Sequence, residues 1–125
     1  GLADRLLFVG EVPAPDLPQL MRGLSLVVQL PRYEGYGMVP LEGLASGVPF
    51  VGSDAGYYHS FSAQGRVGAI VPLDATAAAD AADAWLSHAD PGRLAGDARN
   101  IAETHFSAKA EADGIGAVYQ GLWQS

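Results

Sequence analysis

Residues 31–49, PRYEGYGMVPLEGLASGVP, decide how the rest of the chain is interpreted. They place Glu34 and Glu42 around a glycine-rich turn, and the second glutamate falls in a segment predicted to be a helix from about Met38 to Ser46. The first N–H groups of a helix have no partner within the helix, so such a turn can hold an anion. We therefore expect a phosphate-bearing ligand here, with the carboxylates contacting its hydroxyl groups.

Apolar runs alternate with helical segments on both sides of this stretch. The runs are typical of strands buried on both faces, and they cover Leu6 to Gly10 and residues 24–30, 50–53 and 67–72. Short helices are predicted between them, at about residues 16–23, 38–46 and 57–63. This order predicts an α/β fold, a Rossmann-like parallel sheet of about four strands flanked by helices. Ligands of such sheets bind beyond the carboxyl ends of the strands, where the Glu34 loop begins.

The second half of the chain is predicted to be helical. An alanine-rich helix begins at Asp74 or Thr76 and ends near His88, and a second begins at Asp90 and ends near residue 104. Ser107 is predicted to cap a last helix, whose apolar residues recur every three or four positions. The chain shows no repeat and no linker, so residues 1–125 are predicted to be one domain.

Composition excludes several classes of function. The 125 residues are 49% apolar and 17% charged, which is typical of a folded globular domain. A net charge of −7 argues against a nucleic-acid partner and against electrostatic docking on anionic lipid. The absence of cysteine excludes disulfides and thiol chemistry, and the scattered histidines lack the spacing of metal ligands. No run is long enough to span a membrane, so we expect a cytoplasmic domain.

Several motifs in order resemble those of the retaining family-4, or group 1, glycosyltransferases. Glu34 and Glu42 match the family's pattern of two glutamates separated by seven residues, and ASGVP follows at residues 45–49. Four flanking segments are also similar to the family: FVGEVPAPDLPQLM, LVVQLPRYEG, GRVGAIVP and THFSAKAEADGIGAVYQ. The resemblance covers nearly the whole chain. It implies that the chain is the later part of the C-terminal, donor-binding domain of a GT-B fold.

The resemblance implies a site for a nucleotide-diphosphate sugar, with no cofactor and no metal ion. The resemblance implies that Glu34 is the catalytic residue and that it contacts the sugar. Its implied role is to position the sugar or to stabilise charge, and not to act as a nucleophile. Glu42 is implied to bind the ribose hydroxyls. The N–H groups of Gly37 and Met38 are implied to approach the diphosphate, and Val39 to pack beside the nucleoside. The remaining implied donor-binding residues are Gly35 and Tyr36. No Asp-x-Asp triplet occurs, which favours a metal-independent route.

The implied reaction is transfer of a sugar, of hexosyltransferase type and with retention, to an acceptor that the sequence does not name. Glycan, lipopolysaccharide or glycolipid synthesis by a bacterial-type enzyme, cytoplasmic or peripheral to the membrane, is the implied setting. The family's acceptor domain and its Arg/Lys pair cannot be placed in these residues, so we expect the isolated chain to be inactive. Two alternatives remain: a non-catalytic nucleotide-binding or assembly module, and a GT-B nucleotide-sugar epimerase.

Two features depart from the family or lack a place in it. The family usually has a second glycine after Gly56 and then a glutamate, whereas residues 57–60 here are YYHS, so the role of that loop is left open. In the family's strand order, two absent strands would separate Leu6 to Gly10 from the other three. We expect this strand either to pair with residues 24–30 or to pair with another chain, as a homo-oligomer. The plainer interpretations are that Glu34 pairs with Arg32 and that Glu42 is a solvated helix residue.

Overall fold

The computed structural model describes residues 1–87 and 90–123, and within them three parallel strands form one sheet. The strands β1 (Val27–Gln29), β2 (Phe50–Gly52) and β3 (Gly68–Ile70) lie in the order β1-β2-β3. Val51 is the Cα partner of Val28 on one side and of Ala69 on the other. A sheet with β2 at its centre confirms the predicted α/β fold.

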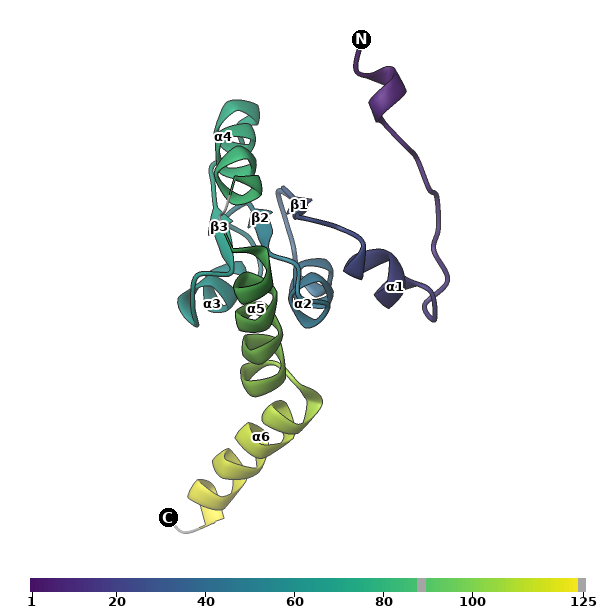
Figure 1. Ribbon diagram of the computed structural model, residues 1–125. Helices are drawn as coiled ribbons and strands as arrows, with labels where there is room; N and C mark the ends of the chain where they lie inside the picture. Colours follow the sequence, from purple (N-terminus) through teal and green to yellow (C-terminus); the bar gives the residue numbers. More distant parts are fainter. Residues whose placement is uncertain (88–89, 124–125) are drawn as a thin grey trace.

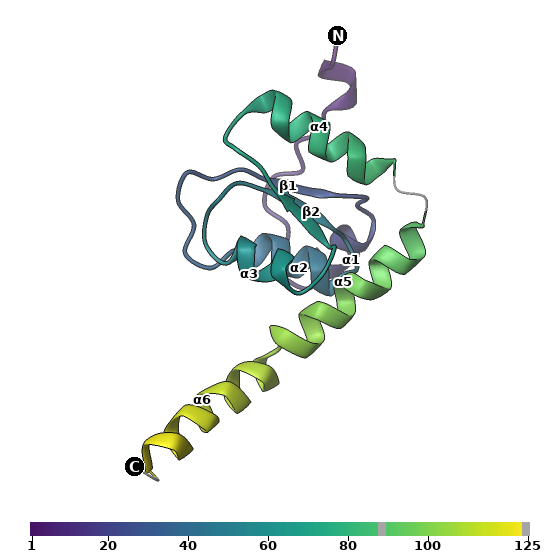
Figure 2. The ribbon, with the colours of Figure 1, turned by 90° about the vertical axis from the view of Figure 1, so that its left-hand side faces the viewer.

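Helices cover both faces of this sheet (Figures 1 and 2). One face is covered by α4 (Ala75–Leu86), and the opposite face by α2 (Met38–Ala45), α3 (Tyr58–Ala63) and α5 (Pro91–His105). The short helix α1 (Leu17–Arg22) packs against α2, and α6 (Ala108–Trp123) extends away from the body of the molecule. A 3-10 turn, η1 (Ala3–Arg5), begins the chain.

The hydrophobic core lies where α2 packs closely on the sheet. Phe50, Leu44 and Phe61 are completely buried there. Gly43 lets α2 lie directly on β1, because a Cβ atom at this position would be 2.9 Å from Cγ2 of Val27. The last turn of α2 is thereby held against the beginning of β1.

Several predicted helix ends are confirmed by their hydrogen bonds. The carboxylates of Asp74 and Asp90 each accept a backbone N–H of the following turn, at 2.9 Å, and Ser107 Oγ accepts the N–H of Ala110 at 3.2 Å. Gly47, with φ of 84°, follows the end of α2 in the left-handed conformation. The first short helix, predicted at about residues 16–23, has Asp16 at its N-cap position, but the side chain of Asp16 makes no capping bond. The predicted end of the alanine-rich helix at His88 lies outside the described residues.

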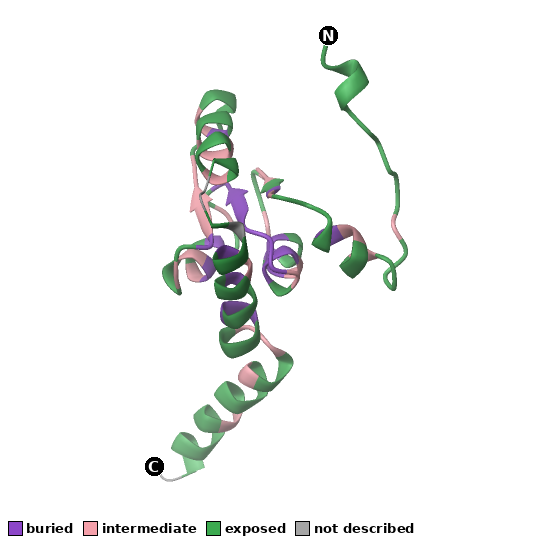
Figure 3. Cartoon of the chain, viewed as in Figure 1, coloured by how far each residue is buried: buried purple, intermediate pink, exposed green. Residues whose placement is uncertain are grey.

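The first predicted strand is wrong. Residues 6–10 belong to no strand and do not pair with β1, so the sheet has three strands in the described residues and not about four. Their side chains lie in solvent, with Leu7 at 85% and Phe8 at 92% exposure (Figure 3). An apolar run indicates that its side chains favour burial, but it does not show which strand would pair with it. Pairing with another chain stays a prediction.

The last helix also has little burial. No residue of α6 is buried, and the predicted apolar positions Ile115 and Tyr119 are 52% and 71% exposed. Figure 3 shows this helix as almost entirely exposed. None of the helices in the described part of the chain combines the length and the apolar character needed to cross a bilayer.

Candidate functional site

The centre of the candidate site is the first turn of α2. Gly37 is its N-cap, and the first helical bond runs from the N–H of Leu41 to the carbonyl of Gly37 at 3.3 Å. No side chain caps this end, and Pro40 has no N–H to donate. The N–H groups of Met38 and Val39 therefore have no acceptor within the helix. The structure places a helix N-terminus able to receive an anion where the sequence predicts one.

Only glycine fits at the N-cap. The φ angle of Gly37 is 105°, in the left-handed region, and a Cβ atom there would lie 2.3 Å from Cε1 of Tyr58. Gly52, at the end of β2, faces the other side of the same ring, where a Cβ atom would lie 2.5 Å from Cδ2 of Tyr58. The ring of Tyr58 thus occupies the space between two glycines and fixes the start of α2 relative to the sheet.

Tyr58 also anchors the carboxyl end of β1. Its ring is completely buried, and its hydroxyl donates a hydrogen bond of 2.8 Å to Oε1 of Gln29. Burial, and to a lesser degree the carboxylate of Glu34, raises the pKa of Tyr58 from 10.0 to about 12. The hydroxyl is therefore protonated at neutral pH and acts as the donor in this bond.

The loop before α2 is held by the segment that follows β2. Ser53 Oγ donates to the carbonyl of Pro31 at 2.6 Å, and the N–H of Tyr57 donates to the carbonyl of Tyr36 at 2.9 Å. At Gly56, with φ of 51°, a Cβ atom would lie 2.9 Å from the Tyr36 oxygen. Residues 53–57 therefore support the loop that carries Glu34, and they include Tyr57, the first residue of the 57–60 loop whose role the sequence left open.

Glu34 lies within this supported loop and is partly buried. One of its carboxylate oxygens accepts the N–H of Gly35 at 2.9 Å. The structure describes both Glu34 and Arg32 and shows no ion pair between them, so the plainer interpretation of Glu34 has no support. Its Cγ atom lies against the segment that follows β2, 3.0 Å from the position of a Cβ atom built at Gly56.

Glu42 lies one turn further along α2, partly buried between two hollows of about 310 Å³ each. The first lies between α2 and α5 and is also lined by Met38 and Phe106. The second lies between α2 and α1 and is also lined by Leu17. Neither hollow is lined by Glu34. Glu34 lies at the start of α2 together with the other predicted donor-binding residues of the loop, which are Gly35, Tyr36, Gly37, Met38 and Val39. Glu42 is connected with this group only through the hollow that it shares with Met38.

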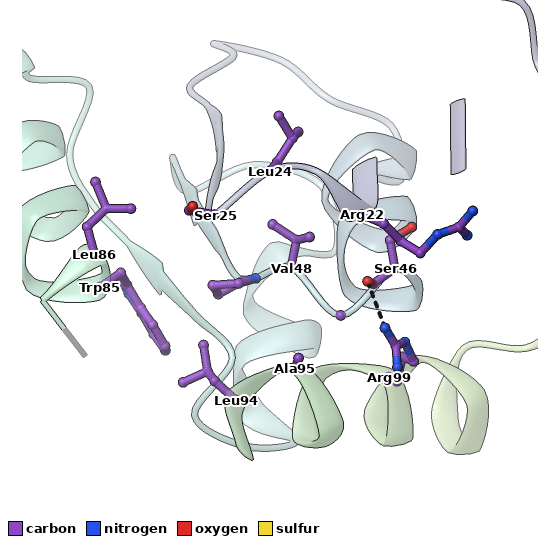
Figure 4. A pocket seen from close by; sticks show the side chains of 12 residues that line it. Arg22, Leu24, Ser25, Ser46, Val48, Trp85, Leu86, Leu94, Ala95 and Arg99 are labelled. Carbon is purple, nitrogen blue, oxygen red and sulfur yellow. Dashed lines mark hydrogen bonds between the residues drawn. The ribbon is translucent and has the colours of Figure 1, made fainter. Parts of the chain in front are cut away.

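Another hollow, of about 330 Å³, lies at the opposite end of the strands (Figure 4). It is lined by the chain just before β1 and β2, including Ser25 and Val48, and by Trp85 and Leu94. At its rim Arg99 donates a hydrogen bond of 3.3 Å to the carbonyl of Ser46. Because ligands of parallel sheets bind at the carboxyl ends of the strands, this hollow is not the candidate donor site.

Sequence reasoning did not assign Tyr57 and Tyr58. The signal was present, since two consecutive aromatic residues follow Gly56. Aromatic periodicity alone does not show that the two rings point in different directions. Tyr58 is completely buried, whereas Tyr57 is 51% exposed beside Tyr36.

Comparison with known proteins agrees with this geometry. The model of the family described as glycosyl transferases group 1 matches residues 1–104. The chain is 40% identical to the lipopolysaccharide core biosynthesis mannosyltransferase LpsB of Rhizobium meliloti (strain 1021), over 98% of this chain and 35% of that protein. It is 32% identical to the D-inositol 3-phosphate glycosyltransferase of Nocardia farcinica, over 100% of this chain and 26% of that protein.

A solved structure is similar as well. Sucrose-phosphate synthase from Thermosynechococcus elongatus has a TM-score of 0.82 and 29% identity, over 98% of this chain and 31% of that chain. The chain therefore spans about a third or less of the length of these proteins. Family match, relatives and fold agree, and the chain belongs to the group 1 glycosyltransferases, as part of the C-terminal domain of a GT-B fold.

Proposed function

We propose that this chain binds the donor in a glycosyltransferase that transfers a hexosyl group from a nucleotide-diphosphate sugar, with retention and without a metal ion. The observation that carries this proposal is the uncapped start of α2, where the N–H groups of Met38 and Val39 lie between Glu34 and Glu42 in the sequence. Relatives named as lipopolysaccharide core mannosyltransferases support synthesis of a bacterial glycan or lipopolysaccharide as the setting.

Each part of the site has a chemical role in this proposal. Departure of a nucleoside diphosphate builds negative charge on the bridging oxygen, and preorganised N–H donors stabilise it. A helix N-terminus contributes about 0.3–1 kcal/mol per anion in an exposed setting and more where water is excluded. Glu42 accepts hydrogen bonds from the ribose hydroxyls, and Glu34 accepts them from the sugar. Both carboxylates act as acceptors that orient the donor.

The chain is proposed to bind the donor without completing the reaction. It spans about a third or less of its relatives, and the acceptor and its binding residues are assigned to the remaining length of the full enzyme. We expect the isolated chain to transfer no sugar, measured as product formation with a panel of nucleotide sugars. Sugar transfer by the chain alone would contradict this division.

Calorimetric titration of the chain with GDP and UDP tests donor binding. We expect weak binding of at least one nucleotide and a loss of about 10- to 100-fold in affinity for Glu42→Ala, because hydrogen bonds to a charged group contribute about 1.5–3 kcal/mol. Glu111→Ala, which removes a carboxylate from the exposed surface of α6, is the matched control. Equal affinity of Glu42→Ala and the original chain would contradict the role of Glu42. Self-association with no nucleotide binding would favour an assembly module.

A further inference from the structure

We propose that Tyr57, packed on Tyr36, forms an aromatic platform for the sugar ring of the donor. The inference rests on the proposed function, because it places the sugar beside Glu34. It goes further by assigning a residue outside the glutamate motif. It also names the surface of the sugar that Tyr57 contacts, which is the face that carries the C–H groups of the sugar.

The backbone of Tyr57 is fixed beside the glutamate loop. Its N–H donates to the carbonyl of Tyr36 at 2.9 Å. The preceding residue, Gly56, lies so close to Glu34 that a Cβ atom at Gly56 would be 3.0 Å from Cγ of the glutamate. Tyr57 therefore belongs to the surroundings of Glu34, although 23 positions separate them in the sequence.

Three aromatic rings lead from the core to the surface at this point. Phe61 is completely buried, and the ring of Tyr36 packs edge-on against it with centroids 6.0 Å apart. The ring of Tyr57 then lies on Tyr36, with centroids 4.8 Å apart and an angle of 32° between the planes. Tyr36 is 38% exposed and Tyr57 51% exposed. The outer ring is thus held in place by its neighbours and still open to a ligand.

An open ring on the residue that follows Gly56, which itself lies against Glu34, matches the surface of a hexopyranose. The face of an aromatic ring is negative and attracts the positive edges of C–H groups, which cover the apolar face of the sugar. A carboxylate accepts hydrogen bonds from the hydroxyls at the rim of the same sugar. Glu34 uses one oxygen for the N–H of Gly35 and has further acceptor capacity. A nucleobase also stacks on aromatic rings, but the nucleoside is proposed to lie near Val39 and Glu42 on α2.

Exposure separates Tyr57 from its neighbour in the sequence. Tyr58, its neighbour, is completely buried and is explained by packing between Gly37 and Gly52, but packing does not account for the open face of Tyr57. Tyr57 is therefore the aromatic residue of this loop that remains available for a ligand.

The test compares nucleotides with and without the sugar. Calorimetric titrations of the chain would use GDP against GDP-mannose and UDP against UDP-glucose, for the original chain, Tyr57→Phe and Tyr57→Ala. Tyr119→Ala, an exposed tyrosine of α6, is the matched control. We expect Tyr57→Ala to weaken binding of the nucleotide sugar by about 2- to 10-fold and to leave the nucleoside diphosphate unchanged, whereas Tyr57→Phe binds both as before.

A second measurement needs no variant. Saturation-transfer NMR with irradiation of the aromatic protons should enhance the C–H protons of the hexose. Unchanged affinity of Tyr57→Ala for the nucleotide sugar, an equal loss for nucleotides with and without sugar, or enhancement confined to base and ribose protons would each overturn the platform and leave donor binding intact. Failure of the original chain to bind any of the four nucleotides would overturn the proposed function and the platform with it.

Discussion

Two parts of the molecule are rich in apolar and aromatic residues but are packed in different ways. Around the candidate site, Phe50, Tyr58 and Phe61 lie in mutual ring contact, with centroids 5.8–6.3 Å apart, and all three are completely buried. At the two ends of the chain, Phe8 and Trp123 are each 92% exposed. The site is therefore held by contacts within this chain, whereas the apolar ends contribute little to its stability.

Substitution of Gly37 should have the largest effect, because it acts on the most tightly packed point of the site. Alanine at this position combines a left-handed backbone, which costs about 1–2 kcal/mol, with overpacking against Tyr58, which costs about 1–3 kcal/mol. We expect Gly37→Ala to lower the free energy of unfolding by about 2–5 kcal/mol in urea denaturation.

Gly35→Ala is the matched control for this substitution. A Cβ atom at Gly35 meets no atom within 4 Å, and its φ is not in the left-handed region. Its free energy of unfolding should stay within about 0.5 kcal/mol of the original chain. Similar stability of the two variants would show that the packing of Tyr58 does not fix the start of α2.

Removal of one hydroxyl should have a smaller effect. Tyr58→Phe keeps the ring between the two glycines and deletes only the bond to Gln29. We expect a loss of about 0.5–1.5 kcal/mol in the free energy of unfolding, the usual net contribution of one hydrogen bond. Tyr119→Phe, on exposed α6, should cause no measurable loss. No difference between these two variants would mean that the hydroxyl does not stabilise β1.

The raised pKa of Tyr58 predicts a pH dependence of stability. The folded chain holds this proton up to about pH 12, whereas the unfolded chain releases it near pH 10.0, so folding is favoured by protonation. The contribution is complete below pH 10 and is lost as the pH rises through about 12. Denaturation at a series of alkaline pH values should show this decline in the original chain and a weaker one in Tyr58→Phe. Equal declines in both would contradict the assignment.

A polar residue at the exposed N-terminal segment should have the smallest effect. We expect Phe8→Ser to change the free energy of unfolding by less than about 0.5 kcal/mol, because its side chain is in solvent before and after unfolding. Sedimentation of the original chain and of the variant would accompany the measurement. A loss of stability that grows with protein concentration would instead show that this segment pairs with another copy of the chain.

These two parts also show how far the sequence predicts the structure. Local chemistry fixes local features, so Asp90 and Ser107 were correctly predicted as helix caps, and of the two predicted starts Asp74 and Thr76 the structure shows Asp74 as the cap. The glycine-rich turn correctly predicted the uncapped start of α2. The buried position of Tyr58 and the open position of Tyr57 were not predicted, because they depend on contacts between distant segments. Gly37 and Gly52 enclose the ring of Tyr58, whereas the ring of Tyr57 packs on Tyr36.

The failure at the N-terminus has a related cause. The run from Leu6 to Gly10 has the composition of a buried strand, but strand pairing is a contact between distant segments and is not encoded in the run itself. The roles of Glu34 and Glu42 toward a ligand also stay predictions. Glu34 and Glu42 lie on either side of the first turn of α2, and the distance between them depends on how the loop curves. The number of residues between them does not determine that curvature.

The central claim, that the donor diphosphate binds at the start of α2, is tested most directly by mapping amide shifts in NMR during a titration with GDP and UDP. We expect the N–H signals of Gly37, Met38 and Val39 to shift most, and the same shifts to require about 10- to 100-fold more nucleotide in Glu42→Ala. Largest shifts at Gly47, Ala95 and Arg99, around the hollow at the opposite end of the sheet, would contradict it.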